Sequence, residues 1–364
     1  MSSKSKGHDS TNKQPKFDFL AHYVEPWNWL LPFTDELNKE PEKRNKYKHL
    51  APIYWFMSLA YLFGSKAFIV VDRFKYEGAN GGLMGRTTLL RNFGYHFFLK
   101  GQRKKIRQRI CQAVLDAQKD GMDVVGLGAL TKAEWLTEGG KRIVDELGAD
   151  LKIPIVHGDT LTAATVIRQA KKLIETYKVT TPVFITGATS KIGRAVVLAL
   201  AEDGIPVIMH TASKERFAAI RAETNGHAQY LSMSSSLENG KDCQLWITGK
   251  AVPYGKKLLP YIPEGAAVLN FSVPNPVPDK NFSLRPDVKF CEGGLLSYNP
   301  LKTTLRVTMR MKPGITYACH AGTMVHAYKG WKHHEVGHVD MATIPETWQA
   351  AEELGFFLPP LGVE

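Results

Sequence analysis

The apolar residues of the chain occur in short runs separated by stretches of helical spacing, a pattern that is typical of an α/β fold. The clearest unit is a strand over residues 182–186, a helix that ends before Gly204 and a second strand over residues 205–210. Strand, helix and parallel strand in this order build a doubly wound sheet. We therefore expect a Rossmann-type dinucleotide-binding domain over residues 181–300.

A glycine turn over residues 187–193 joins the first of these strands to the helix. Gly187 allows the chain to leave the strand sharply, Gly193 allows the helix to pack closely, and the helix N-terminus offers N–H groups to a pyrophosphate. The alternative is an ordinary turn whose glycines serve packing alone. The residues expected to bind the dinucleotide here are Gly187, Thr189, Ser190, Lys191, Ile192 and Gly193, with Gly249 after a later strand.

The loop after the second strand contains Thr211, Ser213 and Lys214. An NAD site carries an acidic side chain near this position for the ribose 2′-hydroxyl, whereas hydroxyls and a cation suit a 2′-phosphate. The loop therefore favours NADP(H). Ser213 could equally act as the N-cap of the following helix, and the two roles are compatible.

Two more strand-to-helix units precede this domain and predict a substrate-side α/β layer over residues 111–180. One of them ends in His157, Asp159 and Thr160, which we place on the substrate or nicotinamide side, although capping of the next helix also explains Asp159 and Thr160. Residues 301–364 are expected to form a C-terminal helical segment that packs back on the domain.

Composition and charge add two constraints. The four cysteines form no C-x-x-C pair, which suits a reducing compartment and indicates neither a disulfide framework nor a cysteine metal site. The net charge is +12, and residues 1–109 supply 20 Lys and Arg against 9 Asp and Glu, which is +11 of that total. No nucleic-acid-binding module accompanies these charges, so a nucleic acid partner is not expected.

The basic N-terminal part also holds the most apolar stretch, residues 51–71, in which 16 of 21 residues are apolar or aromatic. After a disordered tail over residues 1–16, we expect residues 17–110 to dock on an anionic membrane surface or on a partner, with the basic and aromatic residues 89–109 facing the headgroups. We therefore expect a cytoplasmic protein that is peripherally associated with a membrane. The alternative is that residues 51–71 form a buried core helix or two strands.

Several ordered motifs together resemble known families. The plant eceriferum wax-synthesis proteins, very-long-chain aldehyde decarbonylases, are similar in their C-terminal domain over about residues 50–364, through residues 157–164, 187–193, 318–322 and 330–337. Cyanobacterial long-chain acyl-[acyl carrier protein] reductase is similar over about residues 110–364, through residues 126–131, the same glycine turn, Cys319 and Trp331.

The resemblance to the reductase implies NADPH-dependent reduction of a long-chain acyl-CoA or acyl carrier protein thioester to a fatty aldehyde. Cys319 then corresponds to the nucleophile that forms an acyl-cysteine, and adjacent His320 could activate it. The iron-binding histidine boxes of the plant proteins do not occur in this chain, so decarbonylation by the chain itself is not expected. The alternative function is a non-catalytic NADP-binding partner subunit of a membrane-bound, aldehyde-consuming enzyme of wax or alkane synthesis.

Overall fold

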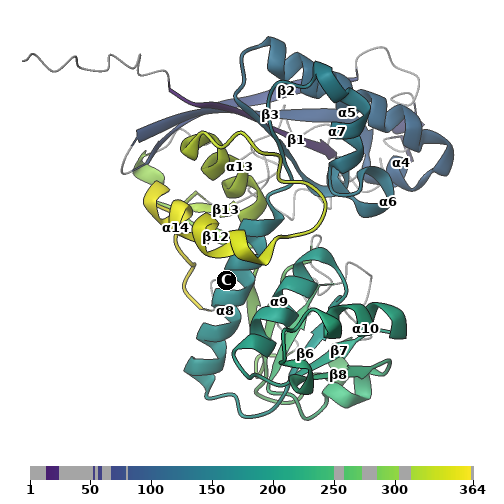
Figure 1. Cartoon of the computed structure of the whole chain (residues 1–364), viewed down its shortest axis with the longest axis vertical. Coiled ribbons are helices and arrows are strands. Elements are labelled where there is room, and N and C mark those ends of the chain that lie inside the picture. Colours follow the sequence, from purple (N-terminus) through teal and green to yellow (C-terminus); the bar gives the residue numbers. More distant parts are fainter. Residues whose placement is uncertain are drawn as a thin grey trace, which may run out of the picture.

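The computed structural model describes residues 14–23, 67–78, 81–249, 258–272, 285–302 and 313–361, together with residues 52–53 and 56–59. These residues form two lobes, each built on its own main sheet. The long helix α8 (Asp159–Tyr177) runs from one lobe to the other (Figure 1). Its N-terminus therefore lies where the two lobes meet, which is the place where a site shared by both lobes can form.

The first lobe contains a five-stranded sheet in the order β2-β3-β1-β4-β5. Strands β2 and β3 pair antiparallel, whereas β1 lies parallel to both β3 and β4, and β4 lies parallel to β5. The strands are β1 (Lys16–Tyr23), β2 (Phe68–Gly78), β3 (Gly81–Phe93), β4 (Val124–Leu127) and β5 (Ile155–Val156). The helices are α4 (Gly94–Phe98), α5 (Arg103–Lys119), α6 (Glu134–Thr137) and α7 (Lys141–Leu147), with short 3-10 turns η3 (Lys100–Gln102), η4 (Ala129–Lys132) and η5 (Gly148–Asp150).

The second lobe contains a six-stranded parallel sheet in the order β11-β10-β9-β6-β7-β8. The chain fills one half outward through β6 (Val183–Thr186), β7 (Val207–His210) and β8 (Leu231–Ser234). It then returns to the centre and fills the other half through β9 (Leu245–Thr248), β10 (Ala267–Asn270) and β11 (Lys289–Glu292). This is the doubly wound strand order, with its switch point between β6 and β9. The predicted Rossmann-type sheet is confirmed.

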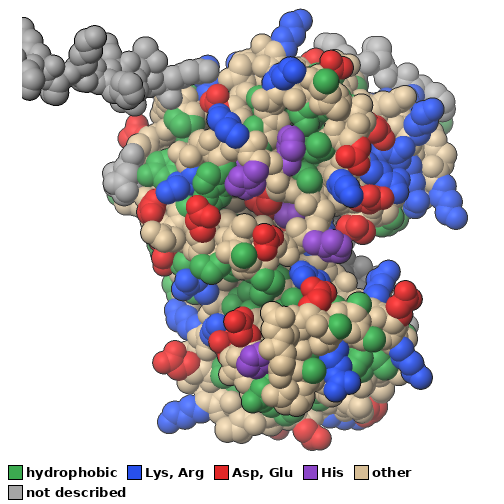
Figure 2. All heavy atoms as spheres, in the orientation of Figure 1, with side chains coloured by type: hydrophobic (Ala, Val, Ile, Leu, Met, Phe, Trp, Pro, Cys, Tyr) green, Lys and Arg blue, Asp and Glu red, His purple; other side chains and the backbone are tan. Residues whose placement is uncertain are grey.

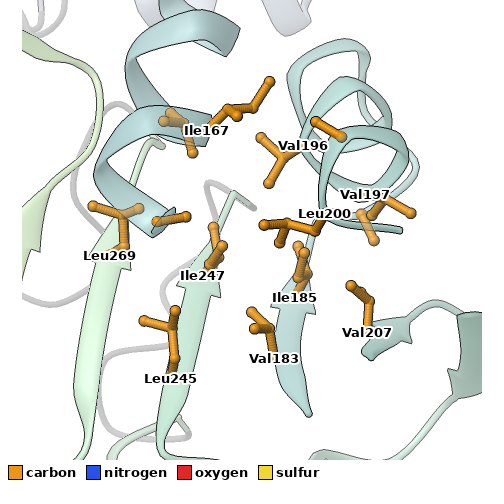
Figure 3. Close-up of a cluster of buried hydrophobic side chains, with 14 of the residues drawn as sticks. Ile167, Val183, Ile185, Val196, Val197, Leu200, Val207, Leu245, Ile247 and Leu269 are labelled. Carbon is orange, nitrogen blue, oxygen red and sulfur yellow. The ribbon is translucent and has the colours of Figure 1, made fainter. Parts of the chain in front are cut away.

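Two helices of the second lobe, α9 (Lys191–Glu202) and α10 (Lys214–Ala222), follow β6 and β7, and the 3-10 turns are η6 (Ala228–Tyr230), η7 (Leu237–Gly240) and η8 (Leu259–Tyr261). The apolar runs of the central strands are buried because helices cover the sheet. On one face, strand side chains meet those of α8 and α9 (Figure 3); the labelled members include Val183, Ile185, Leu245, Ile247 and Leu269 from the strands and Ile167, Val196 and Leu200 from the helices. This shared core holds the N-termini of α8 and α9 in fixed positions.

The C-terminal segment returns to the first lobe, as the yellow part of the ribbon shows (Figure 1). It contains a short antiparallel pair, β12 (Leu295–Ser297) and β13 (Ile315–Tyr317), the 3-10 turns η9 (Pro300–Lys302) and η10 (Met341–Thr343), and the helices α13 (Ala318–Lys329) and α14 (Ile344–Leu354). Both helices contact α8. The described residues 313–361 of this segment therefore pack against α8, and they include strand β13 as well as helices.

The structure differs from the expected domain division in the N-terminal part. Residues 17–110 were expected to form a docking region separate from the layer over residues 111–180, yet β1, β2 and β3 belong to the same sheet as β4 and β5. Seven of the eight residues of β1 are buried, because the strand lies between β3 and β4. Residues 1–13 and 24–50 lie outside the described residues. Among those described, we find no helix that combines the length and apolar character needed to cross a bilayer.

Candidate functional site

Three helix N-termini meet between the lobes. Helix α8 begins at Asp159, α9 begins at Lys191, and Cys319 is the second residue of α13. Lys191 Nζ lies 3.2 Å from Asp159 Oδ2, which brings the glycine turn of the second lobe against the start of α8. Helices α8 and α9 follow the carboxyl ends of the parallel strands β5 and β6, where such sheets form their sites. Helix α13 instead follows β13 of the antiparallel pair and is placed here by its packing on α8.

Asp159 lies at the centre of the cluster. Lys132 Nζ donates hydrogen bonds to Asp159 Oδ1 at 2.5 Å and to the carbonyl oxygen of His157 at 2.6 Å. Burial by itself would raise the pKa of Asp159, but the positive charges of Lys132 and Lys191 outweigh it and hold that pKa well below the ordinary 3.8. Burial lowers the pKa of Lys132, but the Asp159 charge reverses this and leaves it above 10.5. Asp159 and Lys132 are therefore both charged at neutral pH.

A second buried pair adjoins the first. His157 Nδ1 lies 2.7 Å from Glu335 Oε1, and the backbone N–H of Thr160 donates to the same oxygen at 3.2 Å. Burial raises the pKa of Glu335, while His157 more than offsets this, so that the pKa lies below 4.5. The capping alternative is not what the structure shows, because no side chain caps α8. Asp159 instead binds lysines, and the Thr160 main chain binds Glu335.

Cys319 lies at the edge of this cluster, half-buried. Gly158 packs directly against its backbone: a Cβ at Gly158 would lie 2.2 Å from the Cys319 carbonyl oxygen. Burial raises the pKa of the Cys319 thiol above 9.0, Lys132 lowers it and Asp159 raises it further. The thiol is therefore protonated at neutral pH.

The His320 ring does not lie against this thiol, although the His320 main chain lowers the pKa of Cys319 through a hydrogen bond. Its ring lies among three phenylalanine side chains, with ring centroids 5.7 Å from Phe17, 4.8 Å from Phe19 and 5.7 Å from Phe74. Its Nδ1 is 3.1 Å from Thr316 Oγ1, and burial lowers its pKa to about 4. Successive helix residues point in different directions, so adjacency in sequence to Cys319 does not place the His320 ring over the sulfur.

The glycine turn has the geometry that its sequence predicts. Gly187 has φ +71°, and a Cβ there would lie 2.6 Å from the Gly249 main chain, so the ends of β6 and β9 touch at the switch point. A Cβ at Gly193 would lie 2.2 Å from the Gly187 carbonyl oxygen. Ser190 caps α9 by accepting a hydrogen bond from the Gly193 N–H at 3.1 Å. The turn therefore presents a helix N-terminus at the position where doubly wound sheets hold a pyrophosphate.

The other expected cofactor residues surround this turn. Thr189 is partly exposed, and Ile192 packs against the core of the second lobe. Ser213 caps α10 by accepting from the Arg216 N–H at 3.2 Å, and its own N–H donates to Thr211 Oγ1 at 3.1 Å. Lys214 is exposed at the start of α10. Thr211, Ser213 and Lys214 follow β7, the strand next to β6.

Sequence reasoning missed two members of the charged cluster, Lys132 and Glu335. Lys132 had a usable signal, since η4 directly follows β4 and strand ends border sites in parallel sheets. Glu335 lies in the resembling motif over residues 330–337, but only the fold shows its partner. The hydrogen bonds His157 N to Glu335 O and Glu335 N to Ile155 O, both 2.9 Å, join it to β5. The described residues hold no cluster of three or more His, Cys, Asp or Glu suited to a metal ion.

Comparison with known proteins identifies the family. Residues 183–359 match the family described as "CER1-like, C-terminal domain". Residues 183–359 carry a CER1-like C-terminal domain. It is 34% identical over 347 residues to very-long-chain aldehyde decarbonylase GL1-1 of Oryza sativa subsp. indica, which covers 93% of this chain and 52% of that protein. Very-long-chain aldehyde decarbonylase GL1-2 of Oryza sativa subsp. japonica is 32% identical, with 94% and 52% covered.

The chain thus spans about half the length of these curated relatives. Among solved structures, L-tryptophan dehydrogenase from Nostoc punctiforme is 10% identical with a TM-score of 0.41, over 95% of this chain and 82% of that one. The assignment of a Rossmann-type sheet does not depend on that likeness, because the strand order of the second lobe establishes it directly.

These relatives overturn the expected activity. The prediction of an NADPH-dependent acyl-thioester reductase acting through an acyl-cysteine is wrong, since the CER1-like relatives are named aldehyde decarbonylases and not reductases. The expected acyl-CoA or acyl carrier protein substrate followed only from that activity, so it has no further support. The relatives' names agree better with the alternative, a role beside an enzyme of wax or alkane synthesis.

Proposed function

We propose that this CER1-like chain is an NADP(H)-binding partner of a membrane-bound enzyme that converts very-long-chain aldehydes in wax or alkane synthesis. The observation that carries the proposal is the doubly wound sheet, with the glycine turn and the capped N-terminus of α9 at its switch point. We assign aldehydes as the substrate class because the relatives are named aldehyde decarbonylases. The same names are the reason for proposing an aldehyde-converting enzyme as the partner.

The residues around the turn fit a phosphorylated dinucleotide. The N–H groups at the start of α9 suit the pyrophosphate, and Gly187 and Gly193 keep the turn tight. Lys214 is exposed one strand away, beside the Thr211 and Ser213 hydroxyls, where a ribose 2′-phosphate would be recognised. The dinucleotide, when bound, supplies a hydride donor or acceptor.

The charged cluster suits the head group of an aldehyde. An ammonium group has three N–H donors, and Lys132 uses two of them, on the carbonyl oxygen of His157 and on Asp159. Its third donor is available to a carbonyl oxygen that enters between the lobes. Asp159 holds Lys132 protonated and positioned, and the His157–Glu335 pair fixes the start of α8 behind it. In this proposal the chain binds and orients the aldehyde, and the partner carries out the conversion.

Dinucleotide titration tests the first half of the proposal. Purified chain should bind NADPH more tightly than NADH, as measured by calorimetry. Lys214→Ala should weaken NADPH binding about tenfold and leave NADH binding unchanged, because it removes one charge-assisted phosphate contact. Lys172→Ala, an exposed lysine on α8, is the matched control and should change neither. Failure of the unaltered chain to bind either dinucleotide would contradict the proposal.

Reconstitution tests the second half. Membranes that contain an aldehyde-converting enzyme should form product faster when the chain and NADPH are added together than when either is added alone. Lys132→Met should remove most of this gain while NADPH binding persists, because the lysine is assigned to the aldehyde and not to the dinucleotide. A chain that converts the aldehyde fully without any partner would overturn the assignment as a partner subunit.

A further inference from the structure

Exposed apolar side chains gather at one edge of the first lobe. Eleven large hydrophobic residues are exposed in the described part of the chain, and six of them lie in two short segments. The helical residues 52–53 and 56–59 contribute Ile53, Phe56, Met57 and Leu59, and the end of α4 contributes Phe98 and Leu99. Phe56 is 77% exposed and Phe98 is 62% exposed. Side chains this exposed project from the surface and do not line a pocket.

A partly buried hydrogen bond holds the two segments together. Ser58, which is 1% exposed, has its hydroxyl 2.5 Å from the Tyr95 hydroxyl of α4. The helical residues 56–59 are therefore fixed beside α4 on their buried side, and their apolar side chains remain outward. We refer to residues 52–53, 56–59 and 98–104 as the docking edge. Concentrated apolar exposure of this kind marks an interaction surface.

Basic residues follow the apolar ones directly. Lys100 and Lys104 are exposed, and the Arg103 guanidinium lies 4.5 Å from the centroid of the Trp135 ring. That ring in turn lies 5.6 Å from the ring of Phe98. Figure 2 shows Lys and Arg side chains gathered on the side of the first lobe where Figure 1 places α4 and α6. The docking edge thus combines apolar residues with a cationic margin, and the half-buried Trp135 ring adjoins it.

Two nearby acidic residues are already paired and do not cancel this margin. Glu146 pairs with Arg107 at 2.8 Å, and Glu138 pairs with Arg142 at 2.5 Å, so each of these carboxylates already has its own arginine. No ion pair of Lys100 or Lys104 is found among the described residues. Their charges therefore remain directed to the solvent, where they attract anions.

We propose that the docking edge binds the surface of an anionic phospholipid bilayer. Aromatic and aliphatic side chains that project outward can enter the boundary between headgroups and acyl chains, and a tryptophan with flanking lysines is typical of that boundary. The lysines contribute attraction to phosphate headgroups, which apolar contact with a protein groove would not need. This inference goes beyond the proposed function, because it requires neither a dinucleotide nor an aldehyde.

Vesicle flotation tests the proposal on the full chain without dinucleotide. The chain should float with vesicles of phosphatidylcholine and phosphatidylglycerol and stay at the bottom with phosphatidylcholine alone. Phe56→Ser combined with Phe98→Ser should lower the partition coefficient about tenfold or more, because two large apolar side chains no longer enter the interface. Lys100→Glu combined with Lys104→Glu should lower it as much at low salt and less at high salt, since added ions screen headgroup attraction.

Matched controls separate the docking edge from general exposure and charge. Leu301→Ser changes an apolar residue that is 92% exposed elsewhere, and Lys172→Glu reverses an exposed charge on α8; both should float like the unaltered chain. Circular dichroism and NADPH titration verify that each variant is folded. The proposal is overturned if the unaltered chain stays at the bottom with both vesicles, if it floats equally with both, or if the controls lose as much. It is also overturned if the phenylalanine variants only dissociate a dimer.

Discussion

The ion pairs of Asp159 allow a sharp test of the charged cluster. We predict that Asp159→Asn lowers the free energy of unfolding by about 3 kcal/mol at neutral pH. The side chain of Asp159 is 5% exposed and touches Lys132 at 2.5 Å and Lys191 at 3.2 Å. Removing its charge leaves two largely buried ammonium groups without their carboxylate, and breaking a buried pair in this way costs about 3–5 kcal/mol. Asparagine keeps the shape and one acceptor oxygen, so the lower end applies.

The matched control is Asp203→Asn. Asp203 also pairs with a lysine, Lys171 at 2.6 Å, but the two side chains are 38% and 44% exposed. Exposed pairs of this kind contribute roughly 0–1 kcal/mol, so this variant should unfold almost like the unaltered chain. The same type of substitution is thus compared in a buried and an exposed setting.

Urea unfolding followed by tryptophan fluorescence measures the free energy of unfolding of both variants. Repeating it at several pH values tests the direction in which the Asp159 contribution changes. The pKa of Asp159 is held below 3.8, so its contribution is present above that pH and is lost as pH falls through the folded-state value. The difference between the unaltered chain and Asp159→Asn should therefore be constant from neutral pH to about pH 4 and shrink below it. A loss under about 1 kcal/mol at neutral pH, equal to the control, would refute the buried charge cluster.

Three further results are expected. Gly158→Ala should destabilise the chain by roughly 2 kcal/mol more than Gly121→Ala in urea unfolding, because both glycines have positive φ but only Gly158 packs against Cys319; equal losses would refute this packing. Cys319 should be alkylated slowly by iodoacetamide at neutral pH, and more slowly still in Lys132→Met, because Lys132 lowers the pKa of the thiol. Peptide mass spectrometry measures the rate, and faster alkylation of the variant would contradict this effect of Lys132. His320→Leu should reduce acid destabilisation between pH 6.5 and 4 by up to about 3 kcal/mol, because the unfolded state binds a proton there that the buried ring does not; an unchanged pH profile would exclude a buried neutral ring.

The sequence by itself determined the parts that depend on local pattern. The strand, turn and helix around Gly187 are set by short-range spacing and by a positive φ that glycine adopts without strain, and Ser213 caps its helix through a contact three residues away. The doubly wound sheet was expected from these units, because right-handed crossovers leave few arrangements for parallel strands. The order of its strands was established by the structure. The choice of NADP(H) stays a prediction of the loop after β7.

Only the tertiary structure decided how distant residues meet. Strand β1 enters between β3 and β4, more than sixty residues away, so an aromatic run that resembled a docking arm is the interior of a sheet. Asp159 meets Lys132 and Lys191 because η4 and the start of α9 both lie against the start of α8. His320 points away from Cys319 into a phenylalanine cluster because of the direction of α13. Spacing along a chain carries no information on such contacts, since loop closure and packing of whole elements determine them.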